Sequence, residues 1–308
     1  MFHFINHLNY HDTLTLSSSK IKKVGLITII LALFVNILIV YSAGKEAYTN
    51  LRKANYVPAI TAHRGLSDSA PENTIPAFDQ AIVDKADWIE LDVHQTKDGV
   101  LVISHDANLK RTTGKKQFIY NLTYAELEKL DVGSSFSSDF SNTHIPTLEE
   151  VLKRYQGKVK LNIELKPTGH ENNYVQDVID LIKKYNFEDN CMVASMNETT
   201  LKEVKSADSN ITILYNMMVA EGDISKLSYI DNYSVEQSYI TDSLIASVHK
   251  QNKEIFAFTV NDPDTIRKLA DMGVDNIISD NPTLVRNILV HDRLAEKFFF
   301  LKYIFKIA

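Results

Sequence analysis

The chain has 308 residues, enough for one large domain and a short appendage, and carries a net charge of -6 from 33 basic and 39 acidic side chains. Generic binding to nucleic acid requires a basic surface, so this balance argues against a nucleic-acid partner. The single cysteine, Cys191, excludes an internal disulfide and a cysteine-rich zinc site.

The first element along the chain is an apolar segment that predicts a transmembrane helix. Residues 24–41 contain no charged side chain, and about 18 to 20 apolar residues are enough to cross a bilayer core. The alternatives are a cleaved signal peptide, which would have a shorter apolar region and a small-residue cleavage site, and a buried core helix. We therefore predict a tail at 1–19, a transmembrane helix at 20–43 and a linker at 44–55.

Basic residues on both sides of this segment bear on its orientation. The lysines before it form a tight cluster on a short tail, whereas the basic residues after it are spread out. They are Lys20, Lys22 and Lys23 before the segment and Lys45, Arg52 and Lys53 after it. Because positive charge favours the cytoplasmic side, we expect a single-pass protein of the cell membrane whose large domain is extracytoplasmic.

Beyond residue 55, short apolar runs alternate with segments of helical period. The expected strands are 58–62, 88–92, 160–165, 191–195, 211–214, 233–236, 254–259 and 276–279. The expected helices are 77–83, 175–185, 198–207, 242–251 and 265–272. Eight strands, most followed by a helix, predict an α/β domain at 56–292 that folds as a (β/α)8 TIM barrel. An open doubly wound sheet would need a glycine-rich first turn, which the sequence lacks.

One stretch departs from this alternation. Lys97-Asp98-Gly99 is followed at once by another apolar run at 100–104, which predicts a hairpin extension of the second strand. Residues 107–146, with one short helical pattern at 124–130, then form an insertion after strand 2. Such an insertion is expected on the catalytic rim of a barrel.

The C-terminal segment, 293–308, is aromatic, with lysines interleaved. Such a pattern is typical of a helix packed on a core, which is the preferred interpretation. Since the protein is expected to be anchored in a membrane, an amphipathic helix lying on the membrane surface is the alternative.

Polar residues at the ends of the predicted strands are the candidates for chemistry. They are His63 and Arg64 after the first strand, Glu90 and Asp92 on the second, His105 after the hairpin strand, and Glu164 and Lys166 at the third. Residues two apart on a strand point to the same face. The carboxyl ends of barrel strands meet on one rim, so we expect these side chains to lie together.

Three carboxylates facing one pocket repel each other unless a cation lies among them. Ligation by oxygen alone favours Mg2+ or Ca2+ over zinc or copper. Two histidines beside such an ion supply the acid and base needed to cleave a phosphodiester. Arg64 can hold a phosphate through two hydrogen bonds, and Lys166 adds a point charge. Each residue alone is unremarkable, but their joint occurrence at strand ends predicts an active site.

Eight motifs occur in an order that resembles the glycerophosphodiester phosphodiesterase family, including members with a membrane segment before the catalytic domain. The motifs are His63-Arg64-Gly65, Pro71-Glu72-Asn73-Thr74, Glu90-x-Asp92, Asp98-Gly99, His105-Asp106, Arg111-Thr112-Thr113-Gly114, Ile145-Pro146-Thr147-Leu148-Glu149-Glu150 and Glu164-Leu165-Lys166. The resemblance spans about residues 60–282.

The resemblance implies a metal-dependent hydrolysis of small glycerophosphodiesters to glycerol 3-phosphate and an alcohol. His63 and His105 would be general acid and base, and the cation would be held by the three carboxylates Glu90, Asp92 and Glu164. Arg64 would bind the phosphate, with Lys166 beside it. In the family a hydroxyl of the glycerol attacks phosphorus, and water then opens the resulting cyclic phosphate. The implied role lies in phospholipid and glycerol metabolism.

Further residues are expected around the pocket. Phe258 stands where family members often carry tryptophan, so an aromatic wall for substrate is retained without its indole hydrogen bond. Glu72 and Asn73 are expected to organise the rim, the latter as a helix cap. Ser195, Glu236 and Asn261 occupy strand ends and either line the pocket or are ordinary polar residues of the rim.

Two other functions stay open. A lipid-directed phosphodiesterase, of lysophospholipase D or phospholipase C type, would use the same barrel, cation and histidines. A catalytically silent, membrane-tethered binding protein is the other, although the intact histidines and carboxylates argue against it. The leaving alcohol, the choice between Mg2+ and Ca2+ and the oligomeric state are not indicated by the sequence.

Overall fold

A computed structural model describes residues 57–219 and 227–292, together with five isolated positions near the N-terminus. Those five residues, Ile27, Leu31, Phe34, Val35 and Ile37, are helical. Most of the predicted tail, membrane span and linker, and the segment 293–308, lie outside the described residues. Within the described part of the chain, no helix has the length and apolar character needed to cross a membrane.

The chain divides into two units, Met1–Asn55 and Tyr56–Ala308, and the second contains a closed barrel. Its parallel strands are β1 (Ala59–Ala62), β2 (Trp88–Gln95), β4 (Lys160–Leu165), β5 (Cys191–Ser195), β6 (Ile213–Met217), β7 (Asn232–Glu236), β8 (Ile255–Phe258) and β9 (Asn276–Ser279). Each strand pairs with the next, and β1 pairs with both β9 and β2, which closes the ring. The prediction of an eight-stranded TIM barrel is confirmed.

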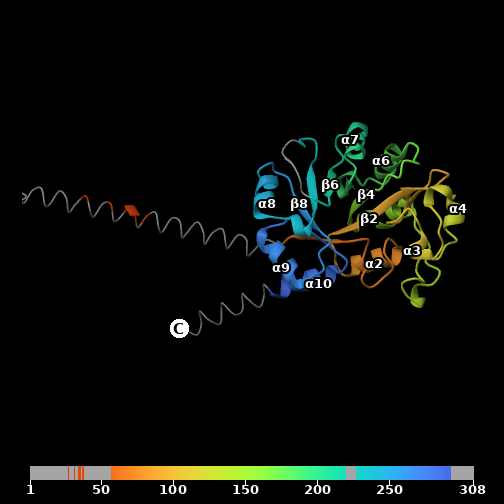
Figure 1. Ribbon diagram of the computed structural model, residues 1–308, viewed down its shortest axis with the longest axis horizontal. Coiled ribbons are helices and arrows are strands. Elements are labelled where there is room, and N and C mark those ends of the chain that lie inside the picture. Colours follow the sequence, from red (N-terminus) through yellow and green to blue (C-terminus); the bar gives the residue numbers. More distant parts are fainter. Residues whose placement is uncertain are drawn as a thin grey trace, which may run out of the picture. The chain divides into compact units, whose positions relative to one another are not determined.

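Helices surround the barrel (Figure 1). They are α2 (Ile75–Val83), α5 (Leu148–Tyr155), α6 (Tyr174–Lys184), α7 (Glu198–Ala207), α8 (Asp242–His249), α9 (Pro263–Met272) and α10 (Pro282–Asn287). Short turns of helix accompany them at η3 (Glu188–Asn190), η5 (Gln237–Tyr239) and η6 (Ile288–Asp292). The sequence-based expectations include neither α5 nor α10. With six residues, α10 is too short to show a repeated helical period.

The local chemistry of α9 shows why these segments are helical. The side chain of Asp262 accepts a hydrogen bond from the Thr265 amide at the N-cap, and Pro263 occupies the first turn, where a missing N–H costs nothing. Gly273 ends the helix at φ 93°, a left-handed conformation that glycine adopts without strain. The buried side chains Ile266 and Leu269 turn one face toward the barrel.

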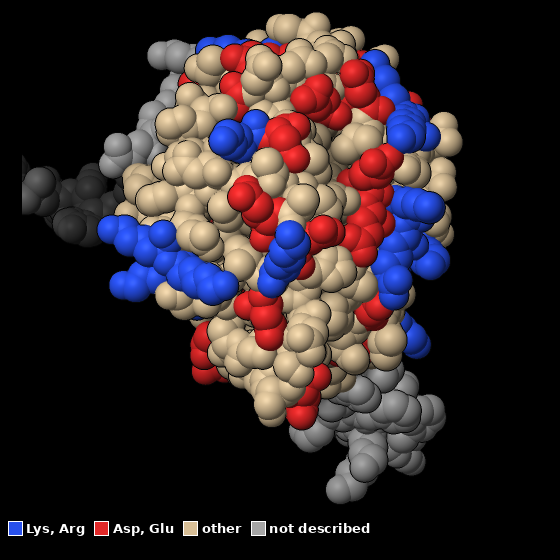
Figure 2. All heavy atoms as spheres, turned by 90° about the vertical axis from the view of Figure 1, so that its right-hand side faces the viewer, with Lys and Arg blue, Asp and Glu red and all other residues tan. Residues whose placement is uncertain are grey.

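The hairpin and insertion after the second barrel strand are also confirmed. The strand β3 (Leu101–Ile103) pairs antiparallel with the last residues of β2, and α3 (Lys110–Thr113), η1 (Ile119–Asn121), α4 (Tyr124–Leu127) and η2 (Ser138–Phe140) follow. The insertion has a small core of its own, made of Val102, Leu109, Ile119, Leu127, Leu130, Val132 and Ile145. It lies beside β2 in Figure 1, with α3 and α4 in yellow. On the face nearest α4, basic and acidic side chains are interspersed (Figure 2).

The expected position of the fifth barrel strand, 211–214, is wrong by two to three residues. The strand begins at Ile213, whose amide donates to the Asp231 carboxylate over 2.8 Å, and it continues through Asn216 to Met217. Asn216 is buried, with 8% of its surface exposed, and it faces the interior of the barrel rather than solvent. The apolar pattern that marks a strand is therefore interrupted at Asn216, where a polar side chain of the strand lines the cavity inside the barrel.

Two apolar layers hold the barrel together. The larger lies between strands and helices, and the smaller is a plug inside the barrel formed by Met192, Ala194, Leu214, Phe256 and Ile278. Burying such side chains contributes roughly 1.5 to 3 kcal/mol each. Above the plug, toward the carboxyl ends of the strands, the interior is polar, and the candidate site lies there.

Candidate active site

The loop after β1 brings Arg64 over the carboxylates of β2. Arg64 has φ 56° and Gly65 φ 84°, and this turn lets the Arg64 amide donate to the Glu90 carboxylate over 2.9 Å. A side chain at position 65 would meet the backbone of Ala77 in α2 at 2.7 Å. Glycine is therefore required by both conformation and space, and it lets α2 pack directly behind the turn.

Three buried carboxylates form the centre of the site. Glu90 and Asp92 project from β2 and Glu164 from β4, where Asp92 and Glu164 are register partners. Only 4%, 1% and 7% of their respective surfaces are exposed. One ligand oxygen from each lies within 4.8 Å of the others. The alternation of side chains along paired strands explains this convergence.

The electrostatics of this cluster favour a bound cation. Burial, reinforced by the charges of Asp92 and Glu164, holds the pKa of Glu90 well above its usual range. Burial and the charge of Asp92 raise the pKa of Glu164 to about 7. Burial alone would raise the pKa of Asp92. The positive charges of Lys166 and Arg64 outweigh this effect, so the pKa of Asp92 is lowered. A positive ion among the three carboxyls would favour the ionised forms of Glu90 and Glu164 and so lower their pKa values.

The donor set fits such an ion chemically. All three donors are carboxylates, which suit a hard divalent cation such as Mg2+ or Ca2+. Asn73 orients one of them: its side-chain amide donates to the Asp92 carboxylate over 2.8 Å, and its carbonyl oxygen accepts from the Asp92 backbone amide. Asn73 is thus a support of the cluster. The helix-capping role expected of it is wrong, since the N-cap of α2 is Thr74.

His63 is held by a carboxylate from the far end of the chain. Its Nδ1 lies 2.6 Å from Asp280, which also accepts from Ser67 at 3.0 Å and from Asn261 at 2.6 Å. Burial acts to raise the pKa of Asp280, but its bonds to His63, Asn261 and Ser67 lower it to about 2. An ionised Asp280 fixes the ring and leaves Nε2 for the cavity that His63 lines.

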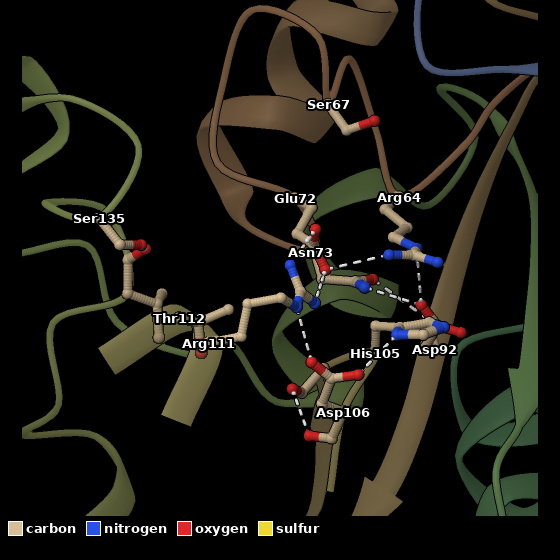
Figure 3. A network of polar contacts seen from close by, with 12 residues as sticks. Arg64, Ser67, Glu72, Asn73, Asp92, His105, Asp106, Arg111, Thr112 and Ser135 are labelled. Atoms are coloured by element: carbon tan, nitrogen blue, oxygen red, sulfur yellow. Dashed lines mark hydrogen bonds and ion pairs between the residues drawn. The ribbon is translucent and has the colours of Figure 1, made fainter. Parts of the chain in front are cut away.

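His105 is oriented by a chain of ion pairs that starts in the insertion (Figure 3). Its Nδ1 lies 2.9 Å from Asp106, which also accepts from Nε of Arg111 over 2.7 Å. Arg111, on α3, also grips Glu72 through two hydrogen bonds of 2.7 Å, and Glu72 accepts from Arg64 over 3.2 Å. Burial lowers the pKa of His105, and the positive charges of Arg64 and Lys166 lower it further. The negative charge of Asp92 acts in the opposite direction but does not outweigh them.

A cavity of about 310 Å3 joins these groups. Eight predicted site residues line it, namely His63, Arg64, Glu90, His105, Glu164, Lys166, Glu236 and Phe258. Lys166 reaches to 3.3 Å from the Asp92 carboxylate, so positive charge lies on both sides of the cluster. The structure therefore brings together two histidines, two positively charged side chains and the carboxylates within a space suited to a small anionic substrate.

Five predicted residues do not line this cavity. Asp92, Glu72 and Asn73 lie behind it in the contacts given above. The buried hydroxyl of Ser195 donates to the Leu165 carbonyl over 2.8 Å, and Asn261 holds Asp280. Both serve the frame of the rim, while Glu236 lines the cavity and also caps η5.

Sequence reasoning missed two supporting carboxylates and one arginine. Asp280 immediately follows the last predicted strand. The rule that selected His63, that polar residues at the ends of predicted strands are candidates for chemistry (the strand-end rule), therefore applies to Asp280 equally. Asp106 and Arg111 stand in the family-like motifs, but their pairing across the insertion depends on a tertiary contact. No local pattern reveals that pairing.

Comparisons with known proteins show which family the chain resembles. The profile described as the glycerophosphoryl diester phosphodiesterase family matches residues 63–284. A glycerophosphodiester phosphodiesterase from Caldanaerobacter subterraneus is 37% identical, over 75% of this chain and 97% of its own. A lysophospholipase D from Homo sapiens is 25% identical, over 77% and 88% of the two chains. Among solved structures, a phosphodiesterase from Oleispira antarctica in complex with the product sn-glycerol-3-phosphate is similar at a TM-score of 0.71 and 30% identity, over 77% of this chain and 98% of that one.

Proposed function

The chain belongs to the glycerophosphoryl diester phosphodiesterase family and is an enzyme of that activity, and we propose that its reaction is metal-dependent and uses His63 and His105 as an acid–base pair. The products would be glycerol 3-phosphate and an alcohol, in phospholipid and glycerol metabolism. The observation that carries the proposal is the convergence of two carboxylate-oriented histidines on one cavity beside three buried carboxylates.

In the first step, Nε2 of His63 takes the proton of the glycerol 2-hydroxyl as its oxygen attacks phosphorus. The hydrogen bond from Nδ1 to Asp280 stabilises the resulting imidazolium, as in other histidine–carboxylate pairs. The bond from phosphorus to the alcohol breaks, and His105 supplies the proton that the departing oxygen needs. The lowered pKa of His105 makes its imidazolium a stronger acid for this transfer.

In the second step, water opens the cyclic phosphate with the roles of the two histidines reversed. Arg64 and Lys166 hold the phosphate oxygens and offset their charge. Glu90, Asp92 and Glu164 would hold the divalent cation, Mg2+ or Ca2+, which when bound polarises the phosphoryl group and adds positive charge.

The leaving alcohol has room beyond His105. A second hollow adjoins that histidine and is lined by Asp106, Ala107, Asn108, Lys110, Arg111 and Phe118. Because it opens on the side of the acid, we place the alcohol there. A wide, open hollow of this kind imposes little shape selection, which supports acceptance of several alcohols.

A lipid-directed activity is the second candidate. Met196 and Met218 border the cavity and remain 45% and 52% exposed, so an apolar chain could pack on them. The similarity to a human lysophospholipase D points the same way. Comparing turnover of a deacylated diester with that of a lysophospholipid separates the two candidates.

We also propose that residues 24–41 anchor the enzyme in the cell membrane, with the barrel on the extracytoplasmic side. The support is the charge-free apolar sequence and the preceding lysine cluster. Retention of the full-length chain in membranes after an alkaline carbonate wash would agree, whereas release into the supernatant would contradict the anchor. A C-terminal reporter active only outside the cytoplasm tests the orientation.

The reaction itself is tested by product identity. Full-length protein in mild detergent is incubated with glycerophosphocholine and divalent cation, and products are assigned by phosphorus NMR. We expect glycerol 3-phosphate and choline from the wild type and a loss of at least about 10^3-fold in kcat for His63→Ala and for His105→Ala. The exposed residue His144, replaced by alanine, is the matched control. Phosphocholine as product, or undiminished turnover by both variants, would refute the proposal.

A further inference from the structure

The bottom of the active-site cavity is polar, although it lies directly above the apolar plug of the barrel. Asn162 on β4, Asn216 on β6 and Ser234 on β7 line the cavity there. Asn216 and Ser234 are register partners, and Asn162 lies two residues before Glu164, one layer deeper in the barrel. We call these three residues the polar floor.

The polar floor is buried, and apart from the side-chain hydrogen bond between Asn216 and Glu164 its hydrogen-bonding capacity is unused within the described residues. Asn162 is 1% exposed, Ser234 0% and Asn216 8%. Both polar atoms of the Asn162 amide, the Ser234 hydroxyl and the Asn216 carbonyl oxygen have no partner in the described part of the chain. A buried polar group without a partner destabilises the folded state, so folding alone does not account for three such residues together.

The neighbouring apolar plug makes the contrast clear. Other positions inside the barrel at this depth carry methionine, leucine and phenylalanine, at Met192, Leu214 and Phe256. Hydrophobic side chains are therefore compatible with the interior at this level. Polar side chains that face a cavity and lack protein partners are typical of ligand-binding groups.

We infer that the polar floor binds the terminal hydroxyl of the substrate's glycerol and thereby selects a glycerol that carries no acyl group. This inference rests on the proposed function and specifies its substrate class. The amide of Asn162 offers a donor and an acceptor, and Ser234 offers a hydroxyl, which together match an alcohol that both donates and accepts.

The position of the reacting groups directs the terminal hydroxyl to the floor. Arg64 and Lys166 hold the phosphate at the mouth, and the 2-hydroxyl must reach His63 at the rim. The leaving alcohol points outward beside His105. The terminal carbon is the one remaining branch of the glycerol, and among the described residues the floor holds most of the cavity's buried polar atoms that lack a partner.

The inference separates the two candidate substrates. In a 1-acyl lysophospholipid the terminal oxygen is an ester, which cannot donate a hydrogen bond and carries a chain too large for the closed end of the barrel. A site built to hydrogen-bond a substrate hydroxyl rejects an analogue that lacks it, because its own buried groups are then left unpaired. The floor thus favours deacylated diesters.

The test compares two substrates with the same leaving group. Full-length protein with excess Mg2+ or Ca2+ is given glycerophosphocholine, or the propane-1,2-diol analogue that keeps the 2-hydroxyl and lacks the terminal one, and choline release is measured. We expect the wild type to prefer the parent by roughly 10- to 100-fold in kcat/KM. In Ser234→Ala and Asn162→Leu the preference should fall below about threefold.

Stability provides a second readout that does not depend on turnover. Without substrate, Ser234→Ala removes a hydroxyl that has no protein partner, so its Tm should equal or exceed that of the wild type. Ser195→Ala is the matched control: its buried hydroxyl has a partner in the Leu165 carbonyl, so Tm should fall by about 2 to 4 °C while the substrate preference stays.

The outcomes are distinguishable. Equal turnover of the two substrates by the wild type overturns this inference and leaves the proposed function standing. The same holds if Ser234→Ala and Asn162→Leu slow both substrates equally, or if a 1-acyl lysophospholipid is cleaved as well as glycerophosphocholine. If neither diester is cleaved by folded wild-type protein, the proposed function fails and this inference fails with it.

Discussion

At the scale of single residues, the site depends on carboxyl groups held in opposite electrostatic states. Glu164 and Glu90 are buried beside Asp92 and resist ionisation, whereas Asp280 is kept ionised by the hydrogen bonds it accepts. In the proposed mechanism the first two would bind the cation, and the last would orient His63 as the base. The surroundings of each carboxyl, rather than its residue type, therefore decide whether its pKa is raised or lowered.

The raised pKa of Glu164 predicts how stability depends on pH and metal. In the folded, metal-free protein its pKa is about 7, against 4.5 for an unperturbed glutamate, so between these values the folded state retains a proton that the unfolded chain has lost. Stability from this group therefore falls as pH rises from about 4.5 to about 7. Added Mg2+ or Ca2+ should raise Tm more at about pH 8 than at about pH 5.5, where protons compete.

Glu164→Gln tests the same electrostatics directly. Removing the buried charge should raise the metal-free free energy of unfolding at about pH 8 by on the order of 2 kcal/mol and abolish the rise in Tm on adding metal. Glu128→Gln, an exposed change on the surface of the insertion, should leave both unchanged. A variant that is less stable without metal, or that keeps the metal response, would argue against a cation at this cluster.

Asp280→Asn should damage catalysis through His63. The amide cannot balance an imidazolium and favours the wrong ring tautomer, so kcat should fall by roughly 10^2- to 10^4-fold with a small change in KM. Steady-state kinetics measure this, and Asp271→Asn on the exposed face of α9 is the control. Near-normal kcat would mean that the contact at 2.6 Å is not used in turnover.

At the scale of elements, the insertion acts on the barrel through one residue. Arg111 on α3 joins Glu72, in the loop after β1, to Asp106, in the loop after β3. Through these contacts, an element outside the (β/α)8 repeat positions both His105 and Arg64. The insertion is therefore part of the catalytic frame as well as a wall beside it.

Arg111→Lys keeps the charge but removes the planar fork that makes three hydrogen bonds. We expect kcat/KM to fall by roughly 10- to 100-fold with Tm within a few degrees of the wild type, because a single ammonium cannot hold both carboxylates. Lys116→Ala, also in the insertion and exposed, should have little effect. Full activity in Arg111→Lys would show that His105 is positioned without the hydrogen bonds from Arg111 to Asp106 and Glu72.

The turn between β1 and α2 gives a structural prediction with an internal control. Gly65 and Gly114 both have positive φ, but a Cβ at Gly65 would clash with the Ala77 backbone, whereas none of the described atoms lies within 4 Å of a Cβ at Gly114. Gly114→Ala should cost about 1 kcal/mol in unfolding free energy, and Gly65→Ala on the order of 3 kcal/mol or more. Chemical denaturation measures both; equal costs would contradict the close packing of α2.

At the scale of the whole molecule, the sequence predicts the barrel because strands and helices alternate with clear apolar periods. The strand-end rule also predicts the cavity-lining residues, such as His63, Glu90 and Glu164, since their spacing on strands sets their direction. What it does not reveal depends on contacts between distant segments. Asp280 reaches His63 only when β9 closes on β1, and Arg111 reaches Glu72 only when the insertion folds back.

The polar floor shows a different limit of sequence reasoning. Asn162, Asn216 and Ser234 interrupt apolar strands, so they resemble weak points in the pattern until the cavity above them is known. Their interpretation requires knowing which buried atoms lack partners, and that follows from three-dimensional packing alone.

The central claim is that the buried carboxylates support turnover by holding one divalent cation. The most direct measurement is the rate of glycerol 3-phosphate release by metal-stripped full-length protein, titrated with Mg2+ or Ca2+. Negligible turnover without metal, restored to a plateau by metal in the wild type and left unrestored in Glu164→Gln, is the predicted result. Undiminished turnover by stripped protein, or full restoration of Glu164→Gln by the same metal concentration, would contradict the account.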